Sequence, residues 1–381
     1  MLAAERQSTI MGRVRREGAV RVADMVSQLG VSDVTVRRDL DALVAQGLLQ
    51  KVRGGAMLPD GQVPEAAPVK PPPSAPPGNS GLPEVGTGSR TIGVLVPKSS
   101  YYFKNMVEGI QATLTPYGGR ILLAVSGYAP EREPDLVKGL LDAGAEGLLL
   151  ASGASLDNGL AAEWACTQPA PTVLLERRAP APYVASVSSV RTAHENGAAL
   201  AVRHLRQSGH ERIALFTRGD TPTAASVERG WRTAMTLPGL GANPLCMSGR
   251  DFPAWPRWER QDTSRLVDRL RRDGTTALLC HSDEDALALL QSGLAELISI
   301  PGDLSLVAYD DEFAEFASPA LTAISPPKRH VGRLAVQTLL DLIDEPGAPV
   351  RHIEIEPALV ARASTAGLSC DLPGVNAASA R

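Results

Sequence analysis

The stretch Ser32-Asp33-Val34-Thr35-Val36-Arg37-Arg38-Asp39-Leu40 decides the fold of the first sixty residues. Val36, Leu40 and Leu43 recur at the spacing of one helix face, which predicts a helix with these three side chains buried. Ser32 stands directly before it, where its hydroxyl can accept a hydrogen bond from a first-turn amide. A short helix that begins at a serine cap and has one apolar face is therefore expected here.

The opposite face of this helix carries residues that can meet a duplex. Val34 and Thr35 fall in the first turn, where a helix lying in the major groove meets base edges. Arg37 and Arg38 point outward and can pair with phosphates or with guanine. An isolated arginine pair is usually only a solvated helix face. Within this pattern we favour DNA contact for Arg37 and Arg38. Asp39 is instead expected to orient an arginine or a backbone amide.

Working outward, the flanking segments complete a small domain over residues 1–58. One helix is expected from about Arg6 to Glu17, and a second carries Val22, Val26 and Leu29 on one face. After the central helix, residues 48–53 are predicted to form a short strand pair closed by Gly54-Gly55. This pair would place Lys51 and Arg53 on a wing beside the DNA backbone. The prediction is a winged helix-turn-helix that contacts DNA through Ser32, Val34, Thr35, Arg37, Arg38, Lys51 and Arg53.

Composition separates this head from the rest of the chain. The 381 residues are too many for one compact domain and carry a net charge of −4, yet residues 1–58 hold nine Arg or Lys against six Asp or Glu. A basic head on an acidic body suits contact with phosphate. The four cysteines match no zinc spacing, which indicates reduced thiols, no metal site and a cytosolic protein. No apolar run is long enough to span a membrane.

Two further zones follow the head. Residues 59–90 hold nine prolines and are predicted to form a partly stiff, polyproline-like tether. From Thr91 onward, short apolar runs alternate with amphipathic segments, which predicts an α/β fold with parallel sheets covered by helices. Two Rossmann-like lobes around a cleft accommodate this many strands. The expected strands are 92–96, 120–125, 147–150, 172–175, 212–216, 277–280, 304–309 and 352–355, and the expected helices are 104–114, 131–143, 193–207, 224–235, 263–272, 283–295 and 331–342.

The head resembles the DeoR-type winged helix-turn-helix. The resemblance rests on residues 32–40, Leu43, Gly47-Leu48-Leu49 and Gly54-Gly55-Ala56. Arg53 stands where that family usually has histidine, and a guanidinium there keeps a phosphate contact. The resemblance implies that the partner is a double-stranded DNA operator.

The body, residues 91–363, resembles the LacI/GalR-type periplasmic-binding-protein-like domain. This resemblance implies one lobe at about 91–208 and 326–347, a second at about 211–323 and 350–363, and a small effector in the cleft between them. Residues 364–381 are expected to be a flexible tail. The motifs that carry the resemblance are Ile92-Gly93-Val94, Tyr101-Tyr102-Phe103, Gly144-Ala145-Glu146-Gly147-Leu148, Gly209-His210-Glu211-Arg212-Ile213, Arg229-Gly230-Trp231, Ser282-Asp283 and Leu306-Val307-Ala308-Tyr309-Asp310-Asp311.

Five residues are expected to line the cleft. Asp310, at the carboxyl end of a strand, could accept two hydroxyl groups of a sugar-like ligand. Tyr102 and Phe103 could stack on a ring, and Trp255 lies in a loop, where an aromatic is less easily explained as core. Ser282 stands where the family often has asparagine. The plain alternatives are lobe packing for the aromatic pair and helix capping for Ser282 and Asp310.

One departure from the family pattern bears on the ligand. The family commonly has an arginine three residues before the glycine of Gly230-Trp231, where it contacts the effector, and this chain has Val227 there. A carboxylate or phosphate effector is therefore less expected in the cleft, and ordinary sugar recognition is also less certain. Arg229 lies nearby but falls on another face of the helix.

Together these patterns predict a cytoplasmic, nucleoid-associated transcription regulator, with repression the favoured mode. The resemblance of the body implies that it acts as a homodimer, paired through the helix around residues 104–114. Its operator affinity would respond to a sugar or related polyol in the cleft. One alternative is a DNA-binding dimer whose cleft is vestigial. Another is a regulator whose body turns over a sugar phosphate, but no isomerase-like phosphate loop is visible. No phosphate loop or nucleophile elbow is visible either, so neither an enzyme nor a cofactor is expected.

Overall fold

The computed structural model describes residues 6, 10–11, 13–14, 19–29, 31–45, 49–52, 55–57, 90–99, 101–156, 159–219, 221–240, 244–253 and 255–367. It divides into two compact units, residues 1–83 and 84–381. The predicted tether, Arg53 of the predicted wing and most of the predicted tail lie outside the described residues.

The first unit has a small three-stranded sheet beside its helices. Strands β2 and β3 form an antiparallel pair, and β3 also pairs with β1. Only β2 lies within the predicted residues 48–53, because β3 begins at Gly55, which was expected to close the pair. The side chains of Val36, Leu40 and Leu43 are buried together, as predicted. Most of the helix expected before β1 lies outside the described residues. The described elements are β1 (Ala19–Arg21), α2 (Val22–Leu29), α3 (Asp33–Ala45), β2 (Gln50–Val52) and β3 (Gly55–Met57).

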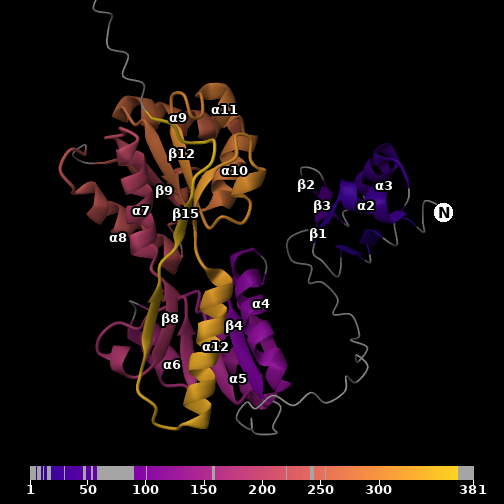
Figure 1. Ribbon diagram of the computed structural model, residues 1–381, viewed down its shortest axis with the longest axis vertical. Coiled ribbons are helices and arrows are strands. Elements are labelled where there is room, and N and C mark those ends of the chain that lie inside the picture. The colour runs from indigo at the N-terminus through magenta and orange to yellow at the C-terminus, as the bar shows by residue number, and fades with distance from the viewer. Residues whose placement is uncertain are drawn as a thin grey trace, which may run out of the picture. The chain divides into compact units, whose positions relative to one another are not determined.

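The second unit contains two six-stranded sheets, one in each lobe (Figure 1). In the first lobe the order is β14-β8-β7-β6-β4-β5, and in the second it is β10-β9-β11-β12-β13-β15. All neighbouring strands are parallel except β13 and β15. The strands are β4 (Thr91–Val96), β5 (Arg120–Val125), β6 (Gly147–Leu150), β7 (Thr172–Leu175), β8 (Ser188–Thr192), β9 (Ile213–Thr217), β10 (Cys246–Ser248), β11 (Ala277–Cys280), β12 (Ser305–Tyr309), β13 (Thr322–Ser325), β14 (His352–Ile355) and β15 (Ala358–Val360).

Helices cover both sheets, and α12 lies beside α4 on the first lobe (Figure 1). The α-helices are α4 (Tyr102–Leu114), α5 (Glu133–Asp142), α6 (Gly159–Cys166), α7 (His194–Gln207), α8 (Pro222–Met235), α9 (Arg260–Asp273), α10 (Asp283–Gln291), α11 (Leu294–Leu297) and α12 (Lys328–Asp344). The short 3-10 helices are η1 (Thr115–Tyr117), η2 (Pro130–Arg132), η3 (Tyr183–Ala185), η4 (Gly249–Asp251) and η5 (Ala314–Phe316).

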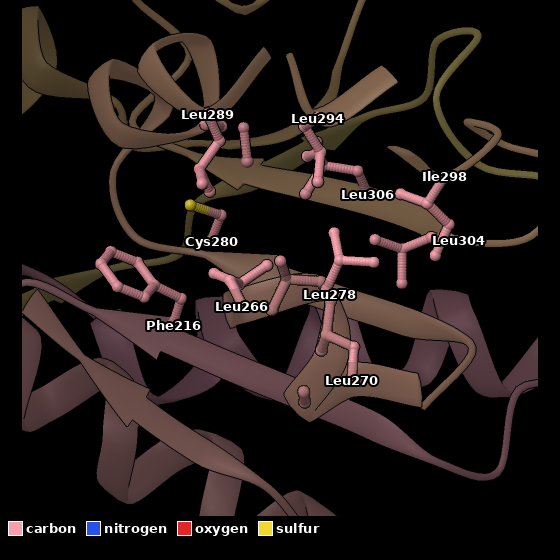
Figure 2. Close-up of a cluster of buried hydrophobic side chains, with 14 of the residues drawn as sticks. Phe216, Leu266, Leu270, Leu278, Cys280, Leu289, Leu294, Ile298, Leu304 and Leu306 are labelled. Carbon is pink, nitrogen blue, oxygen red and sulfur yellow. The ribbon is translucent and has the colours of Figure 1, made fainter. Parts of the chain in front are cut away.

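The core of the second lobe is mainly aliphatic. Leu278 and Leu306, from neighbouring strands β11 and β12, pack against Leu266 and Leu270 of α9, and Phe216 extends the cluster from β9 (Figure 2). Because each parallel strand is covered on both faces, its residues are apolar almost throughout. This explains why the continuous apolar runs in the sequence located these strands.

The structure corrects two of the predicted lobe boundaries. Helix α7 was expected in the first lobe, but its face with Ala198, Ala201 and Leu205 packs in the core of the second lobe. Strand β14 was expected in the second lobe, but it pairs with β8 of the first. The chain therefore passes between the lobes after β8, after β13 and between β14 and β15. These three passages agree with the number that the resemblance implied.

Strand β8 was missed because its sequence is not apolar. Ser188, Ser189 and Thr192 are buried in it, and each finds a hydrogen-bond partner. For example, the Ser189 hydroxyl lies 2.8 Å from Nδ1 of His352 in β14. A buried strand can hold polar side chains when neighbouring elements satisfy them, and a search for apolar runs overlooks such a strand.

Candidate functional site

Helix α3 begins as the serine cap predicts. The amide of Thr35 donates to Ser32 Oγ at 3.3 Å, and the two hydroxyl oxygens lie 2.9 Å apart. The cap satisfies one of the free amides of the first turn. Ser32 and Thr35 are therefore held together at the start of the helix.

The outward face of α3 matches the predicted pattern of exposure. Val34 is 75% exposed, although it is a large apolar residue. Arg37 is exposed and forms an ion pair with Asp33 one turn earlier, with 2.5 Å between Nε and Oδ1. Arg38 is also exposed, and no carboxylate of the described residues pairs with it. The helix thus presents one apolar side chain and two guanidinium groups to solvent.

Two further charged contacts organise the head. The carboxylate of Asp39 is buried and accepts from Arg6 Nε at 2.7 Å, so Asp39 orients an arginine as the sequence suggested. Nζ of Lys51 on β2 lies 2.6 Å from Oδ1 of Asp41, which belongs to α3. This exposed pair holds the described part of the wing against the helix.

The body contains a cavity of about 70 Å³ between the lobes, which we call the cleft cavity. Four of the five predicted cleft residues line it: Tyr102 and Phe103 from α4, and Ser282 and Asp310 from the second lobe. Asp310 follows β12 directly and Ser282 stands two residues after the end of β11, so both lie at carboxyl ends of parallel strands. That edge is where open α/β sheets bind ligands.

Trp255, the fifth predicted residue, is not among the residues that line the cleft cavity. Its ring lies 5.2 Å from the guanidinium carbon of Arg218, and its Nε1 donates to Asp285 at 2.8 Å. Arg218 in turn pairs with Asp285 at 3.1 Å and lines the cavity. Trp255 therefore contacts the cleft through an arginine.

Tyr101 fills part of the cleft. Its hydroxyl donates to Asp283 Oδ1 and lies 3.0 Å from Asp310 Oδ2, so one phenol contacts two carboxyl groups of the opposite lobe. Burial and the neighbouring Asp283 carboxylate raise the pKa of Asp310 to about 8. Asp310 is therefore mostly protonated at neutral pH.

Several buried polar atoms of the cleft cavity have no hydrogen-bond partner within the described residues. They are Oδ1 of Asp310, Nδ1 of His281 and Oγ of Ser282. Ser282 also stands at the N-cap of α10, as the capping alternative predicted, and its amide donates to Asp285 Oδ2 at 3.4 Å. Burial, together with the nearby Arg218 charge, lowers the pKa of His281 to about 3, so its imidazole is neutral. Buried polar groups normally have hydrogen-bond partners. Three unpartnered atoms in one cavity therefore mark a place where a polar ligand could supply the missing partners.

Backbone strain gathers in the same region. Tyr101, Tyr128 and Asp310 have φ of 61°, 59° and 93°, and all three line the cleft cavity. A positive φ is unfavourable for residues other than glycine and is retained mainly at functional positions. The strain supports a role for the cleft in ligand recognition.

A buried network behind the cavity connects the lobes. Glu176, which follows β7, accepts from the hydroxyl of Tyr102 at 2.8 Å and lies 3.1 Å from Nε2 of His194. The other ring nitrogen of His194 lies 3.1 Å from the hydroxyl of Tyr309 in the second lobe. Burial alone would raise the pKa of Glu176, but His194 and Thr192 outweigh it and lower that pKa to about 2. The carboxylate therefore stays charged and anchors the network.

Sequence reasoning missed Tyr101, Arg218 and His281 as cleft residues. Arg218 and His281 each come directly after a buried strand, β9 or β11, so the carboxyl-end rule could have found them. Tyr101 gave a weaker signal, because it stands beside the two aromatic residues that were chosen.

Two family models match the chain. A DeoR-like helix-turn-helix domain matches residues 6–62, and a periplasmic binding protein-like domain matches residues 202–365. Within the described residues, no helix combines the length and apolar character needed to cross a bilayer. The same residues contain no group of three or more His, Cys, Asp or Glu side chains that could hold a metal ion.

Curated relatives are transcriptional repressors. The chain is 30% identical over 282 residues to the HTH-type transcriptional repressor PurR of Vibrio vulnificus, covering 72% of this chain and 80% of the relative. The PurR of Aliivibrio salmonicida is 29% identical over 282 residues, covering 72% and 81%. These relatives are regulators and not enzymes, in agreement with the expectation from the sequence.

Solved structures share the fold. A LacI family regulator from a Rhodococcus species aligns with a TM-score of 0.60 at 26% identity, over 73% of this chain and 99% of that one. A LacI family regulator from Enterococcus faecium with bound ribose gives 0.59 at 24% identity, over 73% and 100%. The two-lobed architecture of the body is therefore a known one.

Proposed function

The chain belongs to the LacI-type transcriptional regulators, and from this premise we propose that it is a repressor that senses a sugar or related polyol in its cleft cavity. The proposed operator contacts are the seven predicted head residues, Ser32, Val34, Thr35, Arg37, Arg38, Lys51 and Arg53. The proposed effector contacts are Tyr102, Phe103, Ser282 and Asp310. The protein would act in the cytoplasm at the nucleoid.

The observation that carries the effector proposal is the set of unpartnered atoms in the cleft cavity. Asp310 Oδ1 and Ser282 Oγ can accept hydrogen bonds from hydroxyl groups, and the ring of Tyr102 offers an apolar wall. Convergent polar groups beside an aromatic surface suit a polyol. Ribose is the first compound to test, because it is bound in the related Enterococcus faecium regulator.

Ligand entry would require the lobes to separate. The cleft cavity holds about 70 Å³, well below the ~300 Å³ or more of typical small-molecule sites. Tyr101 occupies the adjacent space and bonds to both Asp283 and Asp310. We propose that an effector replaces this hydroxyl, and that lobe movement then alters the spacing of two heads in a homodimer on two half-sites. Helix α4 is the proposed dimer helix.

A second candidate function is a DNA-binding dimer whose cleft senses nothing. Two observations favour it. The cleft cavity is small and is bridged by the chain's own tyrosine. Val227, where the family commonly has an effector-binding arginine, is fully buried in the core of the second lobe.

Thermal unfolding of the full chain with ribose, other sugars, polyols and nucleosides separates the two candidates. A ligand that binds the folded state at one hundred times its Kd adds about 2.7 kcal/mol of stability. The proposal expects one such compound, with its effect lost in Ser282→Ala and retained in Ser292→Ala, which alters the serine directly after the last residue of α10. It also expects that compound to change operator affinity by more than about threefold. A panel without any stabilising compound would favour the vestigial cleft.

A further inference from the structure

A second, larger cavity opens between the lobes on the side of α8. It holds about 360 Å³ and is lined by the loop after β7, the end of β8 and one face of α8. Four arginines stand in its walls, and we call it the arginine pocket: Arg177, Arg178 and Arg191 come from the first lobe, and Arg229 comes from the second. Its size falls within the range of small-molecule sites.

Three of these guanidinium groups share two carboxylates. Nη1 of Arg178 lies 3.2 Å from Oε1 of Glu354, and Nη2 of Arg191 lies 2.6 Å from the same oxygen. Arg229 lies 2.9 Å from Glu195, which is also 3.6 Å from Arg191. This set therefore keeps one positive charge in excess. The outer two arginines, Arg178 and Arg229, are 45% and 56% exposed and can turn toward a ligand.

Arg177 is the fourth arginine of the pocket, and it is only 5% exposed. Its Nε and Nη1 donate to the main-chain oxygens of Ser152 and Glu176, each at 2.7 Å. Within the described residues no carboxylate oxygen comes within ion-pair distance of it. Burial lowers the pKa of Arg177, which reflects the cost of keeping this cation out of water.

The neighbouring Glu176 does not supply the missing anion. Its carboxylate already accepts from the Tyr102 hydroxyl and from the amide and hydroxyl of Thr192, and it contacts His194. These partners occupy both of its carboxylate oxygens. Glu176 and Glu133 favour the charged form of Arg177 only from beyond ion-pair distance. A buried charge is normally paired, so an anion from solution would complete the site.

We propose that the arginine pocket binds the phosphate group of a small metabolite, held between Arg229 of one lobe and Arg177 and Arg178 of the other. A tetrahedral dianion offers several oxygens to guanidinium groups that approach from different walls of the pocket. A planar carboxylate does this less well. The site is separate from the proposed polyol site, although Arg177 lines both cavities. Phosphate binding would favour the closed arrangement of the lobes.

Calorimetric titration of the full chain with inorganic phosphate and with glycerol 3-phosphate, at matched ionic strength, tests this site. Saturable binding is expected, and Arg229→Gln or Arg178→Gln should weaken it about tenfold or more, since each removes a charge-assisted hydrogen bond. Tighter binding of glycerol 3-phosphate would identify an esterified ligand, and equal binding would identify free phosphate. Both variants alter half-exposed side chains, so the fold should be retained and can be checked by circular dichroism.

The matched control is Arg232→Gln. Arg232 is on the same helix, is 58% exposed and pairs with Glu228, but it does not line the pocket. Phosphate affinity in this variant should stay within about twofold of the parent protein, a difference of roughly 0.4 kcal/mol. No saturable binding by the parent protein, or an equal loss in Arg232→Gln, would overturn the proposal. Because no sugar or DNA is present, the result is independent of the polyol effector.

Discussion

At the scale of single residues, Asp310 is the side chain whose chemistry depends most on its surroundings. Burial first, and then the nearby Asp283 carboxylate, raise the pKa of Asp310 from its usual 3.8 to about 8. The folded protein therefore keeps a proton that the unfolded chain releases above pH 4. Because folding takes up this proton, the contribution of Asp310 to stability falls as pH rises from about 4 to about 8.

We predict that Asp310→Asn removes much of this pH dependence. Between pH 6.8 and 8.0 the parent protein should lose about 1 kcal/mol of stability, and the variant should lose much less. This window avoids the titrations of His281 and Asp283, whose pKa values of about 3 and about 6 lie below it. Urea unfolding at several pH values, followed by circular dichroism, measures the effect.

The control for this prediction is Asp135→Asn, which alters an exposed carboxylate in the first turn of α5. It should keep the pH dependence of the parent protein. An Asp310→Asn curve that runs parallel to the parent curve would mean that Asp310 is already ionised at neutral pH. The proposed hydrogen-bonding pattern of the cleft cavity would then need revision.

At the scale of elements, α3 separates two arginines that look equivalent in the sequence. Arg37 is tied to Asp33 one turn earlier, whereas no described carboxylate pairs with Arg38. We predict that Arg38→Ala weakens operator binding about tenfold or more without changing stability, since one good base contact is worth about 1–3 kcal/mol. Fluorescence anisotropy at fixed salt, on a duplex selected by the full chain from random DNA, measures this affinity.

Arg203→Ala serves as its control, because Arg203 is an exposed helical arginine of the body. Operator affinity should be unchanged in that variant. If Arg38→Ala also binds as tightly as the parent protein, α3 does not contact DNA through this face. The proposed set of operator contacts would then be wrong.

Elements were predictable wherever periodicity alone determines them. The buried face of α3 with Val36, Leu40 and Leu43 follows from the helical repeat, and strands such as β11 follow from apolar runs. The lobe to which an element belongs did not follow. Strand β14 pairs with β8, more than 150 positions earlier in the chain. Nothing in the local pattern of His352–Ile355 specifies that partner. The prediction of its lobe came from the resemblance to the family, and the pairing with β8 contradicts it.

Candidate site residues divide in the same way. Asp310 and Ser282 were found because a residue at the carboxyl end of a parallel strand faces the cleft wherever the sheet lies. The contacts of Trp255 with Arg218 and Asp285 are tertiary and leave no local signature in the sequence. The four arginines of the arginine pocket lie on three different elements of two lobes, so the sequence could not bring them together.

At the scale of the whole body, the lobes are joined across the cleft by a few polar contacts. Asn105 of α4 donates to both oxygens of Glu312, at 3.0 and 2.9 Å. Lys98 lies 3.4 Å from Glu284. The Tyr101 hydroxyl reaches Asp283 and Asp310. Together with the buried contact between His194 and Tyr309 and the stacking of Tyr101 near Phe313, these polar contacts hold the lobes together in an arrangement that lobe separation would break.

Among them, Tyr101 contributes the contact that an effector would have to replace. Tyr101→Phe deletes the hydroxyl but keeps the ring, whose centroid lies 5.5 Å from that of Phe313. The amides of Glu312 and Phe313, which donate to Asp283 Oδ2 at 2.7 and 2.8 Å, report on this side of the cleft. Losing one hydrogen bond across the lobes costs about 1 kcal/mol, so the hydrogen exchange of these two amides should become roughly fivefold faster.

Tyr117→Phe, which alters an exposed phenol in η1, is the control and should leave both exchange rates unchanged. Equal exchange in Tyr101→Phe and the parent protein would mean that the hydroxyl does not hold the lobes together, and an effector would gain nothing by replacing it.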